Sequence, residues 1–116
     1  MEPQPRFIHG VFAFEGKGLA TPYLLDPSAI YKVPRDKRAQ LIYLRGGNSS
    51  GELVYLTLTC DGKALRYFPI GAKSGTHVPL AVVEDLFPEA KLEVFIAAPA
   101  GTAGTVVVDI GLIEVD

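Results

Sequence analysis

Residues 52–62, ELVYLTLTCDG, alternate between two kinds of side chain, and this feature constrains the fold more than any other in the chain. Successive side chains of a β-strand point to opposite faces, so a period of two predicts a strand with one face in a core. The apolar face holds Val54, Leu56, Leu58 and Cys60. Asp61-Gly62 follows, and this pair tolerates the positive φ angles of a two-residue turn. The sequence therefore predicts a hairpin that returns through residues 63–70.

Short apolar runs bounded by turn residues fill the rest of the chain. Residues 38–45, 91–99 and 104–115 are predicted strands, and GGNSSG at 46–51 is a predicted connection between two of them. Helical periodicity is almost absent, and at most one short helical turn is expected near residues 81–87, before Pro88. With 116 residues, 48% of them hydrophobic, the chain has the size of one domain. We predict a single all-β domain over residues 1–116, a two-sheet antiparallel β-sandwich of jelly-roll or Ig-like type.

Two of the predicted strands are apolar on both faces. Residues 41–44 and 106–115 show this pattern. A monomer of this size cannot bury both faces of every strand, so some apolar side chains would stay exposed to water. We therefore predict a homo-oligomer in which a neighbouring copy covers one face. Asp109 is the anomaly, since a buried carboxylate must be hydrogen-bonded or paired with a cation such as Arg38 or Arg45, unless water solvates it.

Composition and charge argue against several classes of partner. The formal net charge is −2, which does not favour binding to a phosphate backbone, so we predict no nucleic-acid partner. No apolar stretch approaches the roughly 20 residues that span a bilayer, so no membrane partner is expected. One cysteine and two distant histidines offer no local metal-ligand spacing and no intrachain disulfide. The first twenty residues lack the pattern of a signal peptide, and we expect a cytoplasmic protein.

Catalytic machinery is not evident in the sequence. Ser74 and His77, with Asp61 or Asp85 to orient the imidazole, are the only hydroxyl-imidazole candidates, but we place Ser74 and His77 in one loop rather than on a rigid nucleophile turn. The glycines at 46, 47 and 51 do not form a phosphate-binding motif. We therefore predict a protein that is not an enzyme and needs no cofactor.

Two functions stay open. The first is a non-enzymatic interaction or assembly module that self-associates through a sheet face, with Asp109 at the interface. The second is a β-sandwich that binds a small ligand or a carbohydrate at a loop edge or concave sheet. The candidate residues for that site are Arg45, Asn48, Tyr55, Arg66 and His77. Tyr55 is chosen because its position in the alternating strand points away from Val54 and Leu56.

Two resemblances bear on this choice. The ending GTVVVDIGLIEV resembles the last strand of jelly-roll carbohydrate-binding modules, which often present Trp or Tyr side chains to sugars; this chain has no Trp and five Tyr. The order of LIYLRGG, ELVYLTLTCDG, LRYFPIGAKSGTHVPL and EDL is similar in layout to the small cytoplasmic β-sandwich transducer proteins of bacterial sensory rhodopsin. That family is tetrameric and non-enzymatic, which the second resemblance implies for this chain.

Overall fold

The computed structural model describes residues 2–116, and for residues 81–84 the backbone alone. Nine strands and no helix cover the described part of the chain, which confirms the all-β prediction. The strands are β1 (Gln4–Glu15), β2 (Tyr23–Leu24), β3 (Ile30–Lys32), β4 (Arg38–Asn48), β5 (Val54–Cys60), β6 (Lys63–Ile70), β7 (Ser74–Leu86), β8 (Lys91–Ala97) and β9 (Ala103–Val115).

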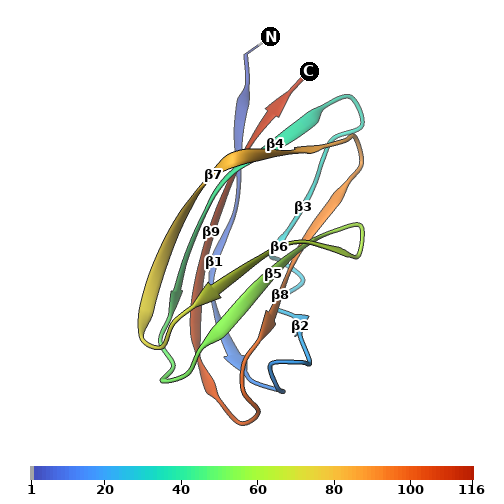
Figure 1. The fold of residues 1–116 in the computed structure, drawn as a ribbon. Helices are drawn as coiled ribbons and strands as arrows, with labels where there is room; N and C mark the ends of the chain where they lie inside the picture. Colours follow the sequence, from blue (N-terminus) through green and yellow to red (C-terminus); the bar gives the residue numbers. More distant parts are fainter. Residues whose placement is uncertain (1) are drawn as a thin grey trace.

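The strands form two antiparallel sheets that pack face to face (Figure 1). One sheet has the order β1-β9-β4-β7, and the other has the order β2-β8-β5-β6, with β3 also paired to β8. The pairing is nested: β1 with β9, β2 and β3 with β8, β4 with β7, and β5 with β6. When β2 and β3 are taken as one interrupted strand, this is the eight-stranded jelly roll, one of the two predicted sandwich types.

The core lies between the sheets and takes one face of each long strand. Val54, Leu56 and Leu58 are fully buried, so the predicted inward face of β5 is confirmed. In β9 the buried set is the even one, which runs from Val106 to Leu112. The odd positions of β9 face out of the sandwich because side chains of a strand alternate.

A bulge in β4 changes the interpretation of residues 41–44. The pairing of β4 with both neighbours shifts register between Leu41 and Tyr43. An extra residue in one strand reverses the alternation beyond it. Leu41 and Leu44 are therefore both buried, while Tyr43 and Arg45 point outward. The sequence of this run looks apolar on both faces because the bulge at Ile42 changes the face on which the later residues lie.

The predicted hairpin is confirmed. Asp61 and Gly62 adopt φ angles of 51° and 83° and connect β5 to β6. Two successive positive φ angles are what a type I′ turn requires. Pro69 lies in β6, which is an edge strand of its sheet, as expected for a residue that cannot donate a ladder hydrogen bond.

The short helical turn predicted near residues 81–87 is not present, and this prediction was wrong. Strand β7 continues to Leu86, and its backbone pairs with β4 through Leu86 opposite Ala39 and Asp85 opposite Gln40. Pairing with β4 satisfies the backbone groups of this segment, and the valines at 82 and 83 favour extended structure. The same strand contains Ser74 and His77, which were predicted to lie in a loop.

Glu114 is a buried charge that the sequence pattern did not predict. It occupies an even, inward position of β9 and is only 4% exposed. Its carboxylate accepts a hydrogen bond from the Tyr31 hydroxyl and lies 3.3 Å from Nε of Arg6. A buried carboxylate needs such partners, so three strands are tied together at this end of the sandwich.

Candidate functional site

The structure divides the predicted site residues between the two outer faces of the sandwich and its interior. Arg45, His77 and Asp109 lie on the outer face of the β1-β9-β4-β7 sheet, which we name the charged face. Tyr55 lies on the outer face of the β2-β8-β5-β6 sheet, which we name the aromatic face. The five residues proposed for one ligand site are therefore not assembled in one place.

Asn48 and Arg66 belong to neither outer face. Asn48 is buried, and its amide nitrogen donates to the carbonyl oxygens of Glu52 at 2.8 Å and Gly71 at 3.1 Å. Its side-chain oxygen accepts hydrogen bonds from the backbone N–H and the hydroxyl of Ser50. Asn48 therefore fixes the connection after β4. Arg66 is half-buried and lies opposite the inward-facing Leu58.

The charged face carries one row of polar side chains that crosses all four strands. His9 on β1 pairs with Asp109 on β9, Asp109 pairs with Arg45 on β4, and Arg45 pairs with His77 on β7. Directly opposed side chains on one sheet face are close enough to interact. We name these four residues the charged row. Arg45 is one of the two cations that the sequence analysis named as a partner for Asp109, and the structure places it beside Asp109.

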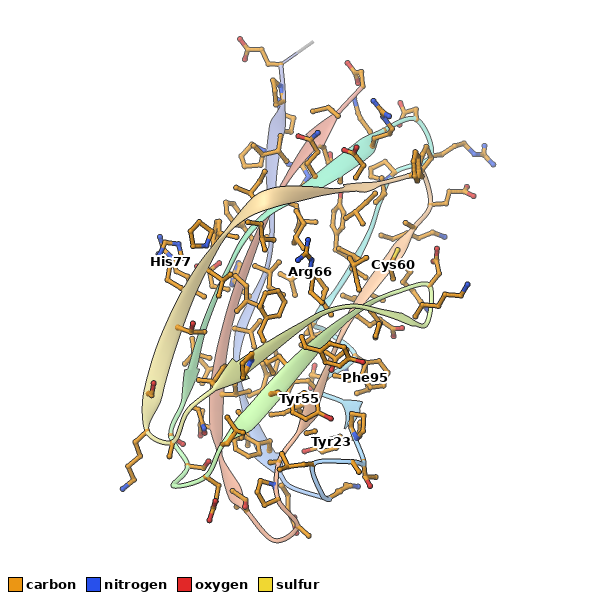
Figure 2. The ribbon with its side chains drawn as sticks, in the orientation of Figure 1. Tyr23, Tyr55, Cys60, Arg66, His77 and Phe95 are labelled. Atoms are coloured by element: carbon orange, nitrogen blue, oxygen red, sulfur yellow. The ribbon has the colours of Figure 1, made fainter. Side chains whose placement is uncertain are left out.

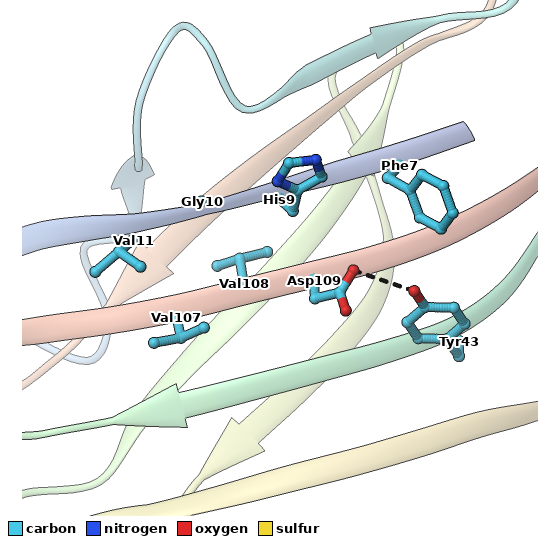
Figure 3. A pocket seen from close by; sticks show the side chains of 8 residues that line it. All are labelled: Phe7, His9, Gly10, Val11, Tyr43, Val107, Val108 and Asp109. Atoms are coloured by element: carbon cyan, nitrogen blue, oxygen red, sulfur yellow. Dashed lines mark hydrogen bonds between the residues drawn. The ribbon is translucent and has the colours of Figure 1, made fainter. Parts of the chain in front are cut away.

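Tyr43 organises the centre of this face (Figure 3). Its hydroxyl donates to Oδ1 of Asp109 at 3.1 Å, and the Arg45 guanidinium lies 5.3 Å from its ring centre. Burial, followed by the hydrogen bond to Asp109, raises the pKa of Tyr43. The ring lies across Gly111, where an added Cβ would be 2.1 Å from a ring carbon. Gly111 therefore leaves the space that lets Tyr43 reach Asp109.

Apolar side chains surround the charged row. Phe7, Val11 and Val107 are 52%, 68% and 45% exposed, although all three are large and hydrophobic. They line a shallow groove of about 460 Å³ together with His9, Tyr43 and Asp109 (Figure 3). A second groove over Gly111 and Ile113 shares Phe7 and Tyr43 with the first. The result is an exposed sheet face on which large apolar side chains lie on both sides of a charged row.

The aromatic face presents Tyr55, Tyr67 and Phe95. Figure 2 shows Tyr55 and Phe95 on one side of the molecule and His77 at the far edge. The rings of Tyr55 and Tyr67 meet edge to face with centres 6.0 Å apart. A groove of about 260 Å³ lies over them, with Thr57 among its lining residues. Such a surface can stack on a flat apolar group.

Catalytic and metal sites find no further support among the described residues. Ser74 and His77 are three positions apart on β7, so their side chains point to opposite faces of the strand. Among the described side chains, no three His, Cys, Asp or Glu gather as metal ligands would. In residues 2–116 we also find no helix with the length and hydrophobicity to cross a membrane.

Sequence reasoning missed several members of both faces. His9, Phe7 and Tyr43 were not selected, because their place beside Asp109 depends on the strand order and on the bulge in β4. Phe95 and Tyr67 were missed for the same reason, since they meet only when β8 and β6 flank β5. The signal that could have found the aromatic face was the outward set of the β5 strand, which includes Tyr55.

Comparisons with known proteins support the fold. No family model and no curated protein matches this sequence. Similar folds occur in structures of the Gt and Gx strains of infectious bursal disease virus, with TM-scores of 0.51 and 0.55, and of T=1 particles derived from infectious bursal virus, with a TM-score of 0.53. Each is 14% identical and matches 97% of this chain.

The likeness to these viral proteins defines the class of fold, the jelly-roll β-sandwich. This chain spans about a third of the length of the matched chains, at 31 to 32%. The resemblances to transducer proteins and to carbohydrate-binding modules stay predictions.

Proposed function

We propose that this protein is a non-enzymatic assembly module that self-associates through its charged face. The observation that carries the proposal is the exposure of Phe7, Val11 and Val107 on one sheet face around the charged row. Contiguous apolar surface of this kind is uncommon on monomers and marks interaction sites. The occupant we propose is a second copy of the chain.

Charge on the face favours a like partner. Asp109 is the one carboxylate in the charged row, and it stands between His9 and Arg45. In a two-fold dimer the same patch meets itself, so each residue of one copy contacts a different residue of the other. Such an arrangement would set each Asp109 against a basic side chain of the other copy, which gives the face electrostatic self-complementarity.

The edges of the sheets favour face-to-face contact over edge-to-edge pairing. Strands β1, β7 and β6 lie at sheet edges and contain Pro5, Pro79 and Pro69. Proline removes a backbone donor, so it blunts an edge strand against pairing with another chain. These three edges are therefore less suited to pairing with another chain than the outer sheet faces are.

The size of the face is sufficient for a stable interface. The molecule measures 47 × 23 × 22 Å, and the charged face runs along its length. A standard interface takes about 800 Å² from each partner, which a face of these dimensions can supply. The similar folds come from a virus and from virus-derived particles, which gives further support to an assembling role.

Sedimentation velocity and light scattering test the proposal. We expect the wild type to be an oligomer at micromolar concentration and Val11→Glu to shift it toward the monomer, because a carboxylate would enter the apolar part of the interface. Phe87→Glu is the matched control, since Phe87 is equally exposed but lies after β7, outside the charged face. Asp109→Ala should also weaken association while the circular dichroism of the fold stays unchanged.

Two results would contradict the proposal. One is a wild type that stays monomeric throughout the concentration range. The other is an oligomer that Val11→Glu leaves intact, which would place the interface elsewhere.

A further inference from the structure

The aromatic face contains a hydroxyl group without a partner. Thr57 points outward from β5, yet it is only 5% exposed, and its hydroxyl oxygen makes no hydrogen bond within the described part of the chain. Its neighbour on the same face, Thr59, donates to the carbonyl oxygen of Glu93 at 3.3 Å. Buried polar groups are nearly always paired, so the Thr57 hydroxyl calls for an explanation.

Aromatic rings flank this hydroxyl on both sides. Phe95 on β8 and Tyr67 on β6 are the residues directly opposite Thr57, and Tyr55 precedes it by two positions on the same face. Directly opposed positions on a sheet face bring side chains within contact distance. These residues line the groove of about 260 Å³ together with Thr57.

One of the rings in this groove is held in place before any ligand arrives. The Tyr55 hydroxyl donates to the carbonyl oxygen of Leu19 at 2.5 Å, and the Tyr55 ring also meets the Tyr67 ring edge to face. Side chains that are ordered in the free protein lose little entropy on binding. The Tyr55 ring is thus fixed as a platform.

We propose that this groove binds a carbohydrate, with one pyranose ring stacked on the tyrosines and one sugar hydroxyl paired with Thr57. A pyranose has an apolar face of C–H groups, which suits the electron-rich face of an aromatic ring, and hydroxyls at its rim. At about 260 Å³ the groove is smaller than the roughly 300 to 1,000 Å³ typical of ligand sites, so it takes a single sugar ring. Tyr67, 64% exposed on edge strand β6, is the side chain that must turn to uncover Thr57.

This site is separate from the proposed assembly surface. The aromatic face belongs to the β2-β8-β5-β6 sheet and the charged face to the other, so the core lies between them. A variant on one face therefore leaves the other intact, and each proposal can fail by itself.

Isothermal titration calorimetry with maltohexaose, cellohexaose and chitohexaose tests the site. We expect saturable binding of at least one of these sugars to the wild type, and Tyr67→Ala should raise its Kd about tenfold, which corresponds to about 1.4 kcal/mol. Thr57→Val should raise the Kd as well, while its Tm stays equal to the wild type or rises, because valine replaces an unpaired hydroxyl with a group of the same shape. Phe87→Ala is the control and should leave the Kd unchanged, since Phe87 is exposed and lies after β7, outside the groove and the charged face.

The proposal is overturned if none of the three sugars binds, or if Tyr67→Ala leaves the Kd unaltered. Tighter binding of indole than of every sugar would also overturn it, because the groove would then select aromatic rings. A lower Tm for Thr57→Val would show that the hydroxyl already has a hydrogen-bond partner in the free protein and is not available to a ligand. Loss of assembly with sugar binding retained would count against the proposed function alone.

Discussion

Tyr31→Phe tests how much the buried carboxylate of Glu114 depends on its hydrogen bond. The variant removes only a hydroxyl, and Arg6 stays 3.3 Å from the carboxylate. Hydrogen bonds to charged groups contribute roughly 1.5 to 3 kcal/mol, and Glu114 is too buried for water to replace the donor easily. We expect the free energy of unfolding to fall by about 1.5 to 3 kcal/mol, which for a domain of this size lowers Tm by roughly 6 to 12 °C.

Urea unfolding followed by circular dichroism measures this loss, and Tyr67→Phe is the matched control. The Tyr67 ring is largely exposed, so deletion of its hydroxyl should change the free energy of unfolding by less than about 0.5 kcal/mol. A loss for Tyr31→Phe that is no larger than the control's would refute the reasoning. Glu114 would then be satisfied by Arg6 and solvent.

The same variant has a defined pH dependence. Burial of Tyr31 and its hydrogen bond to Glu114 raise the pKa of the phenol above its ordinary value of about 10. The folded state therefore favours the protonated phenol, so this stabilisation is complete below about pH 10 and is lost as pH rises further. The difference in unfolding free energy between wild type and Tyr31→Phe should be constant from pH 7 to about 9.5 and should shrink above pH 10.

Two further substitutions and one chemical modification test the fold. Leu56→Ala should reduce the free energy of unfolding by about 2 to 5 kcal/mol, measured by urea unfolding, since Leu56 is fully buried; a loss under about 0.5 would contradict its place in the core. Gly62→Val should lower Tm more than Gly51→Val, because Gly62 has a φ of 83° and Gly51 stands in open space; equal shifts would argue against the turn. Burial raises the pKa of the Cys60 thiol, so iodoacetamide should alkylate it more slowly at pH 7.5 than in urea, and equal rates would show an exposed thiolate.

Local patterns were enough to predict the strands whose partners are near in sequence or whose alternation is regular. The β5–β6 hairpin follows from the alternating run and from Asp61-Gly62, whose φ requirement is a local property. In β9 the same period of two separates an even from an odd set, but both sets are apolar, so the packing of the two sheets decides which set is buried. Regular alternation and turn chemistry are properties of neighbouring residues, so a sequence can show them without knowledge of the third dimension.

Long-range pairing decided the parts that were predicted wrongly or not at all. Strand β7 extends through a segment with helical features because β4 supplies its hydrogen-bond partners. The bulge between Leu41 and Tyr43 exists in the pairing with both neighbours and has no local signature in the sequence. The burial of Glu114 depends on Arg6 and Tyr31, which are far from it in the chain.

The candidate site shows the same limit. Asp109 could be selected because it interrupts an apolar run, and Tyr55 because its position in the alternating strand points away from the core. Their partners could not be selected, because His9 and Arg45 reach Asp109 only through the strand order β1-β9-β4. The five candidate residues chosen from the sequence for a ligand site therefore included residues of both outer faces and the buried Asn48.

The separation of the two faces links the two proposals physically. Assembly through the charged face leaves the aromatic face of each copy directed away from the contact, because the sheets lie on opposite sides of one core. Prolines in the edge strands work against an alternative in which sheets join side by side. An oligomer of this kind would present several sugar grooves at once, and linked sites bind a multivalent ligand far more tightly than one site does. A shallow groove with one stacked ring and one hydroxyl is weak by itself, so self-association is the property that would make such a groove effective on a polysaccharide surface.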